Sequence, residues 1–233
     1  VLDSATGARV STIDLSAHAD GDGLPECGAV EELGGHLWVS CHRLDPSWQP
    51  APEGGVLLKI DPVTETVVGS WTAYSGLTCH AFPGMDELVC HEGVDMDSAW
   101  MPVYEGAIFT FDPVTETFGP DVFTESALAA NTAVFAFGPD GRGLIAATDD
   151  ATSSLLCADL SDGSVTTLID DLGWISAMGV DDRGEAYVLN RSSWTSPYTG
   201  PFGVSVVDLS LCADLGGGVI DVGAEPYQLT FVR

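Results

Sequence analysis

The sequence predicts an all-β chain made of repeated four-stranded antiparallel units. The first observation is a heptapeptide at residues 60–66, Ile-Asp-Pro-Val-Thr-Glu-Thr, which returns almost unchanged at residues 111–117. Each copy lies between apolar runs, which is the pattern of strand, tight turn and strand. The second observation is spacing, because the turn aspartates at 61, 112, 159 and 208 are 51, 47 and 49 residues apart. A period near 50 residues made of strands and turns is typical of a β-propeller with one blade per repeat.

The turn positions divide the chain into sets of strands. We expect strands at residues 28–33, 36–42, 56–58 and 66–72; at 78–82, 87–91, 107–111 and 117–123; at 133–137, 144–148, 155–158 and 164–169; and at 177–180, 186–190, 204–207 and 219–222. Long loops join the second and third strands in three of these blades. No segment shows the apolar periodicity of an amphipathic helix.

The two ends of the chain predict a closing blade. Residues 1–15 read as its two outer strands and residues 227–231 as its inner strand, so a propeller formed by residues 1–233 as one domain would close by joining its termini. No segment supplies the second strand of that blade, which leaves ladder groups unpaired. Either the closing blade is irregular or residues before Val1 have been lost. We favour the second and expect about five blades of a six- or seven-bladed parent, whose missing N-terminal part would associate with this edge.

The charge of the chain excludes some classes of partner. Asp and Glu number 35 against seven Lys and Arg, which gives a net charge of −28. Such a field repels nucleic acids and anionic lipids and attracts cations. The sequence contains no run of 18 apolar residues, so we expect no membrane insertion.

The recurring turn, apolar–Asp–x–x–Thr–Gly/Glu, resembles that of the YVTN/NHL-type propeller repeats. Residues 13–26 also resemble a stretch of uncharacterised bacterial envelope members. The resemblance implies a secreted, periplasmic or cell-surface protein, anchored by lipid if the missing N-terminus carries the signal. These are turn motifs, so they specify a fold and transfer no catalytic residue.

Six cysteines are spaced for pairing. Cys79 and Cys90 flank one hairpin turn and would lie opposite each other, within the reach of a disulfide. Cys27 and Cys41 bracket another turn in the same way. The remaining pair, Cys157 with Cys212, would form a third bridge. Three disulfides favour an oxidising compartment.

Two kinds of metal site are open at this stage. The dipeptide Cys-His occurs three times and would suit zinc or copper, but adjacent strand residues point to opposite faces and bridged cysteines cannot ligate. Calcium is the better candidate, with Asp20, Asp22 and Glu26 as carboxylate ligands in a Gly-rich loop. A second acidic cluster lies at residues 95–97. The alternative is a polar turn capped by its own aspartates.

Aromatic residues recur on the long second-to-third-strand loops. Trp48, Trp100 and Trp194 each lie near a proline on such a loop, and Tyr104 and Tyr198 follow two of them. Polar side chains stand at the bases of the loops: His42, Arg43, His91, Glu92 and Arg191. Each Trp either covers the apolar edge of its own blade or belongs to a shared aromatic rim. Such a rim would suit a carbohydrate or a peptide or protein ligand.

Three function classes remain. The sequence lacks a nucleophile elbow, a phosphate loop and a dinucleotide fingerprint. An extracellular or envelope-associated binding module is the preferred interpretation. The alternatives are a metal-assisted hydrolase or lactonase, with Glu92, Asp95 and Asp149 at the channel mouth, and a mainly structural surface protein.

Overall fold

The computed structural model divides into two compact units, Val1–His80 and Ala81–Arg233. It describes residues 1–45, 49, 51–74, 76–93, 97, 99, 101, 103–149, 152–191, 202–215 and 219–222.

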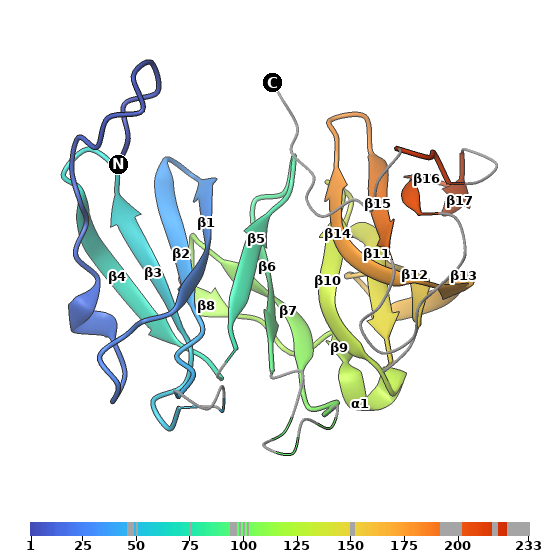
Figure 1. The fold of residues 1–233 in the computed structure, drawn as a ribbon, viewed down its shortest axis with the longest axis horizontal. Helices are drawn as coiled ribbons and strands as arrows, with labels where there is room; N and C mark the ends of the chain where they lie inside the picture. Colours follow the sequence, from blue (N-terminus) through green and yellow to red (C-terminus); the bar gives the residue numbers. More distant parts are fainter. Residues whose placement is uncertain are drawn as a thin grey trace. The chain divides into compact units, whose positions relative to one another are not determined.

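Four antiparallel sheets make up the described fold, and in each the strands follow one another in chain order (Figure 1). The predicted all-β class with four-stranded antiparallel blades is confirmed. The first sheet comprises β1 (Cys27–Leu33), β2 (His36–Cys41), β3 (Val56–Asp61) and β4 (Thr66–Thr72). The second comprises β5 (Thr78–Ala81), where the unit boundary falls, β6 (Leu88–Glu92), β7 (Ala107–Asp112) and β8 (Thr117–Phe118), with β9 (Phe123–Thr124) pairing β7. The third comprises β10 (Asn131–Phe137), β11 (Arg142–Thr148), β12 (Ser153–Asp159) and β13 (Ser164–Leu172). The fourth comprises β14 (Trp174–Val180), β15 (Glu185–Arg191), β16 (Gly203–Asp208) and β17 (Ala213–Asp214).

The middle strands of the sheets carry the core. All five residues of β6 are buried, whereas β4, at the edge of its sheet, alternates between exposed and half-buried positions. A strand buried on both faces must have apolar cover on each side. In the second unit one cluster joins the sheet of β10 to that of β14, and a second joins it to the sheet of β6. Phe137 belongs to the second of these clusters and is fully buried.

The hairpins between third and fourth strands close on one aspartate each. Asp112 Oδ1 accepts hydrogen bonds from the amides of Val114 (2.7 Å) and Thr115 (3.3 Å), and its Oδ2 accepts the Thr115 hydroxyl (2.7 Å). These bonds, led by that from the Thr115 hydroxyl, lower the pKa of Asp112. Backbone amides are accepted in the same way by Asp61, Asp159 and Asp208. The repeat that identifies the fold is therefore a locally satisfied turn.

The fourth strand of the second sheet differs from the single strand predicted at residues 117–123. It is split into β8 and β9, because residues 119–122 include Gly119 and Pro120, and proline has no amide to donate to the ladder. A single helical turn, α1 (Glu125–Leu128), then leads to β10. In the fourth sheet the outer strand predicted at residues 219–222 is reduced to one bridge at Ile220, and β17 takes the outer position.

The N-terminal segment does not form the two outer strands that residues 1–15 predict. It is a hairpin with a single bridge between Leu2 and Arg9, and most of its side chains are exposed. A hairpin without an adjoining sheet is marginal in water, which accounts for the difference. The predicted inner strand at residues 227–231 lies outside the described residues.

The disulfide predictions agree with the structure. Cys27 is bonded to Cys41 across the β1–β2 hairpin, and Cys157 on β12 is bonded to Cys212 in the turn before β17. Cys79 and Cys90 are disulfide-bonded as well. The Cys157–Cys212 bond joins two neighbouring sheets of the second unit, where Arg142 also donates to the Ser210 carbonyl at 2.9 Å.

We expect Asp112→Ala to lower the free energy of unfolding at neutral pH and to reduce its acid dependence. The folded-state pKa is depressed, so the carboxylate stabilises the fold fully above its unfolded pKa of about 3.9 and loses this contribution as the pH falls through the folded value. The difference in stability between wild type and variant should therefore shrink below about pH 4, as measured by urea denaturation across the pH range. Asp112→Asn, which keeps an acceptor oxygen, is the matched control, and its free energy of unfolding should fall by less than that of Asp112→Ala. A difference that stays constant with pH would contradict the argument.

We expect Cys157→Ser combined with Cys212→Ser to destabilise the second unit by about 4 kcal/mol, the chain-entropy value for a closed loop of this length. The sequence separation is 55 residues, against 14 for Cys27–Cys41. The corresponding double serine variant of the hairpin bond should therefore cost less, about 3 kcal/mol. Urea midpoints under non-reducing conditions measure both, and an unchanged midpoint for the first variant counts against a structural role.

Candidate functional site

The candidate site is built on the loops that follow the second strands. These loops follow β2, β6 and β15, each at the same end of its own sheet, and lead to β3, β7 and β16. The aromatic residues Trp48, Trp100, Trp194 and Tyr198, together with Asp95, lie outside the described residues. Tyr104, which precedes β7, is half-buried. The polar residues at the loop bases are described and define the geometry.

Glu125 is the centre of a buried hydrogen-bond network in the second unit. Its side chain is fully buried, and Oε1 lies 3.1 Å from Nε2 of His91, at the end of β6. Oε1 also accepts the Thr132 amide at 2.7 Å, and Oε2 accepts the Gly106 amide at 2.9 Å. A buried carboxylate is tolerated only when several donors satisfy it. This one fixes His91 and joins three segments: the residue before β7, the end of β6 and the start of β10.

Sequence reasoning missed Glu125. It lies 34 residues from His91, in a segment expected to be a connection between strands. Its position in α1 places its carboxylate beside the His91 ring, and Gly106 permits the approach, since a Cβ there would be 2.8 Å from the Glu125 carboxyl group. A glutamate after a Phe-Thr strand end carries no pattern that distinguishes it from a solvent-exposed residue.

Polar residues are buried at the ends of two second strands in the second unit. Glu92 is 7% exposed at the end of β6, and Asn190 and Arg191 are 1% and 8% exposed at the end of β15. Ser153, at the start of β12, is also buried. The predicted residues His91, Glu92 and Arg191 thus occupy matching strand ends on two different sheets, with the β10–β13 sheet between them in the chain.

In the first unit His42 and Arg43 are held by contacts within that unit. His42 Nε2 lies 3.0 Å from the Thr78 hydroxyl, and the ring covers Gly28, where an added Cβ would be 2.8 Å from Nε2. Arg43 donates from Nε to the His18 carbonyl at 2.8 Å. Both side chains are half-buried, so each is a structural member of its loop base.

The acidic loop of the calcium prediction is closed by its own side chains. Asp20 Oδ1 accepts the Asp22 amide at 3.1 Å, and Asp22 Oδ1 accepts the Leu24 amide at 2.8 Å. Burial raises the pKa of Glu26, and the carboxylates of Asp22 and Asp20 raise it further. These contacts match the capped-turn alternative. Among the described residues no group of three or more His, Cys, Asp and Glu side chains is arranged to hold a metal ion, and calcium binding stays a prediction.

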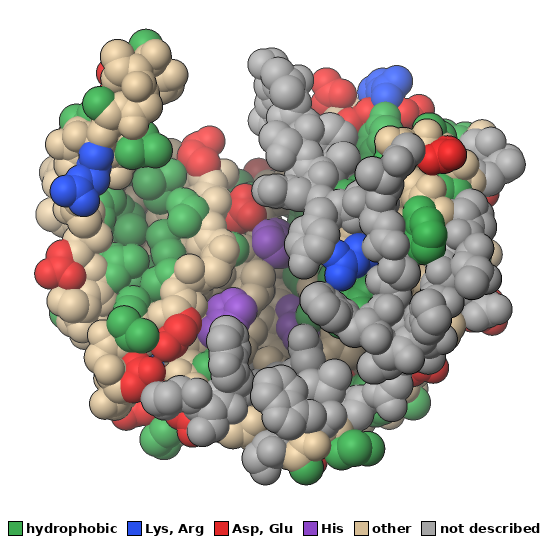
Figure 2. Space-filling view, in the orientation of Figure 1, with side chains coloured by type: hydrophobic (Ala, Val, Ile, Leu, Met, Phe, Trp, Pro, Cys, Tyr) green, Lys and Arg blue, Asp and Glu red, His purple; other side chains and the backbone are tan. Residues whose placement is uncertain are grey.

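Carboxylates dominate the charged surface. On the face in view, Figure 2 shows red side chains at many places and few blue ones, in keeping with a net charge of −28. In the part of the chain that the structure describes, no helix is long and apolar enough to cross a membrane.

The fold is similar to those of solved β-propeller proteins. Hydrazine synthase of Kuenenia stuttgartiensis matches with a TM-score of 0.57 and 10% identity, over 87% of this chain and 51% of that one. A prolyl endopeptidase matches with a TM-score of 0.54 and 17% identity, over 82% and 26%. An acylaminoacyl peptidase of Pyrococcus horikoshii matches with a TM-score of 0.53 and 13% identity, over 79% and 31%. No family model and no curated protein matches the sequence.

These likenesses establish the fold as that of a β-propeller protein. At identities of 10–17% they show architecture alone. The chain spans about half or less of the length of each of these proteins. The propeller part of the predicted family resemblance is confirmed, and the specific YVTN/NHL assignment finds no matching family model.

We expect Glu125→Gln to destabilise the second unit by about 3 kcal/mol, because an amide NH₂ would face backbone donors and the buried histidine would lose its anionic partner. Ser126→Ala is the matched control on the same helical turn; its exposed hydroxyl makes one long hydrogen bond to Thr124, at 3.4 Å, and its loss should change little. Urea denaturation measures both. Equal stabilities for wild type and Glu125→Gln would mean that the network does not hold the loop base.

Proposed function

We propose that the chain is a propeller binding module, and that its long second-to-third-strand loops bind an extracellular carbohydrate or peptide. Trp48, Trp100 and Trp194 supply aromatic surfaces on these loops, and the polar strand ends supply hydrogen-bonding groups. Aromatic faces stack against the C–H face of a sugar or against apolar peptide side chains, while hydroxyls and amides bond to the polar groups. Binding residues gather on loops that a rigid scaffold positions.

The observation that carries the proposal is the burial of polar residues at the bases of these loops. His91, Glu92, Asn190 and Arg191 are all at least 92% buried at the ends of second strands, whose other positions are largely apolar. Burying polar groups costs free energy unless they are satisfied, so a core built only for stability would favour apolar residues there. Buried polar residues at the strand ends that lead into the tryptophan-containing loops support a role in ligand recognition.

The YVTN/NHL assignment and an envelope or extracellular location belong to the same proposal. The cysteines in the structure are all disulfide-bonded among the described residues, which suits an oxidising compartment. The peptidase names among the matched structures belong to proteins that this chain covers by less than a third. These peptidase names therefore give no reason to prefer the hydrolase alternative to the binding function.

We expect Trp100→Ala combined with Trp194→Ala to weaken ligand binding at least tenfold. Each stacking ring contributes roughly 1 kcal/mol beyond its burial, and about 1.4 kcal/mol is a factor of ten. A glycan and peptide array screened with the wild type identifies the ligand, and titration with wild type and double variant gives the ratio of dissociation constants.

Val114→Ala is the control for this experiment. Val114 is 89% exposed on the turn between β7 and β8, at the opposite end of its sheet from the loops, and its loss should leave binding unchanged. The absence of any ligand for the wild type, or unchanged binding by a folded double variant, would return the tryptophans to a packing role. Unfolding of the double variant would do the same.

A further inference from the structure

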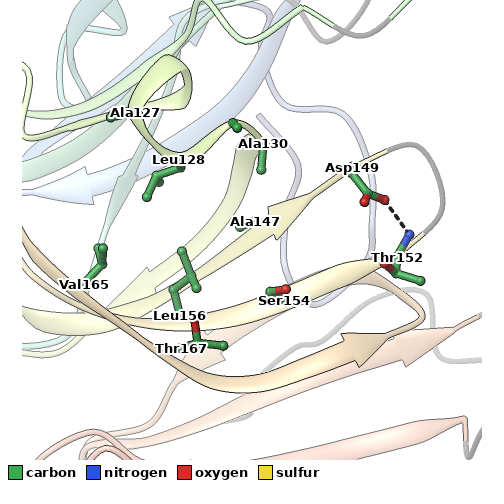
Figure 3. Close-up of a pocket in the computed structure, with 11 residues that line it drawn as sticks. Ala127, Leu128, Ala130, Ala147, Asp149, Thr152, Ser154, Leu156, Val165 and Thr167 are labelled. Carbon is green, nitrogen blue, oxygen red and sulfur yellow. Dashed lines mark hydrogen bonds between the residues drawn. The ribbon is translucent and has the colours of Figure 1, made fainter.

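A pocket opens on the blade whose second-to-third-strand loop is short. It has a volume of about 370 Å³ and lies in the second unit, between the end of α1 and one face of the β11–β13 sheet (Figure 3). None of its lining residues belongs to the loops that carry the tryptophans, so what it binds is argued independently of the function proposed for them. Its volume falls within the range of small-molecule sites.

One end of the pocket is rich in hydrogen-bond acceptors. Asp149, Thr152 and Ser154 lie together there in Figure 3. Asp149 Oδ1 accepts the Thr152 amide at 2.9 Å, which orients the carboxylate. The Ser154 hydroxyl donates to the carboxylate of Asp170, so its oxygen presents lone pairs and a second negative charge stands behind it.

Residues at the end of α1 also line the pocket. The amides of Ala129 and Ala130 both bond to the Glu125 carbonyl, which leaves the carbonyls of Ala127 and Leu128 outside the helix-closing bonds. The last carbonyls of a helix have no intrahelical partner and seek a donor. Both residues line the pocket.

The other end of the pocket is mainly aliphatic, with the Thr167 side chain beside Leu156 in Figure 3. The side chains of Leu128, Leu156 and Val165 gather there in Figure 3, with Ala147 on the sheet between the two ends. Leu156 is 7% exposed and belongs to the core, whereas Val165 is 36% exposed on the edge strand β13. The pocket therefore has an apolar half and an acceptor half, a pairing that suits a ligand with an alkyl chain and a donor-only head.

We propose that this pocket binds an alkylammonium group, with its methylenes on Leu128, Leu156 and Val165 and its NH₃⁺ between Asp149 and Ser154. An ammonium has three donors and no acceptor, which matches the acceptor-rich end. The described lining residues include no Lys, Arg or His to compete as a cation, and the surrounding field of a chain with net charge −28 concentrates cations.

The test is a titration of the full chain with pentane-1,5-diamine at low ionic strength, followed by amide chemical shifts. Saturable shifts confined to residues 127–130, 147–149, 152–156 and 165–167 are expected, and added salt should weaken them. Pentane-1,5-diol, which has the same length without the charge, should bind at least tenfold more weakly. Equal binding of the diol, or no saturable shift with the diamine, would overturn the proposal.

Variants separate the pocket from general attraction to an acidic surface. Asp149→Asn should weaken binding about fivefold, near the upper value for an exposed ion pair. Asp182→Asn removes the same charge from an exposed turn of the same unit and should change binding less than twofold. Val165→Lys places a resident ammonium at the pocket and should abolish binding. A loss for Asp182→Asn equal to that for Asp149→Asn would show that the diamine follows the overall field and would overturn the site.

The ammonium could come from a free diamine or from a lysine side chain of a partner protein. Nα-acetyl-lysine N-methylamide distinguishes the two sources in the same titration. Binding as tight as that of the diamine assigns the pocket to lysine recognition, and markedly weaker binding assigns it to free amines. Both results support the alkylammonium site, provided that the diol and Asp149→Asn controls behave as stated.

Discussion

Burial of the middle strands on both faces is the constraint on which the rest of the structure depends. A strand such as β6, buried at every residue, has no face to give to water, so its sheet is stable only with apolar cover on each side. In the second unit two core clusters cover the β10–β13 sheet on both faces, and one of them also covers a face of the β6 sheet. Because neighbouring sheets cover each other's faces, the connections between strands lie at the two ends of the sheets. A ligand of this chain would therefore contact its turns and loops.

The polar groups at the two ends of the sheets are satisfied by different kinds of hydrogen bond. At the turn end, aspartates such as Asp112 satisfy amides within three residues of themselves. At the loop end, satisfaction is long-range, since Glu125 reaches a strand 34 residues earlier and an amide 19 residues earlier. Long-range polar networks are expensive to assemble and sensitive to the loss of one member. The buried network around Glu125 makes the loop end of the second unit the better candidate for function.

The repeat, the hairpins and the Cys27–Cys41 disulfide could be predicted from sequence because each depends on residues close together in the chain. Cys157 and Cys212 are 55 residues apart and could be paired only as the two cysteines that remained. Cys27 and Cys41 face each other through one turn, and the spacing of Asp61 and Asp112 reports one blade. The split of β8 from β9 was missed although Gly119 and Pro120 signal it. The Glu125 network and the pocket beside α1 could not be found, because they depend on how segments that are apart in the sequence pack. The prediction of two outer strands at residues 1–15 was wrong, since strand propensity without a neighbouring strand does not make a sheet.

The aspartate turns bear on how a chain of this kind grows. Each turn makes its hydrogen bonds with amides and hydroxyls that travel with it in the same short peptide, as the near-identical turns at Asp61 and Asp112 illustrate. A duplicated segment that contains such a turn would arrive with that turn already stable in its new position. Only the apolar faces between sheets would need to adapt after copying. Recombination can therefore lengthen or shorten the array by whole blades, while the loops at the other end diverge toward new ligands.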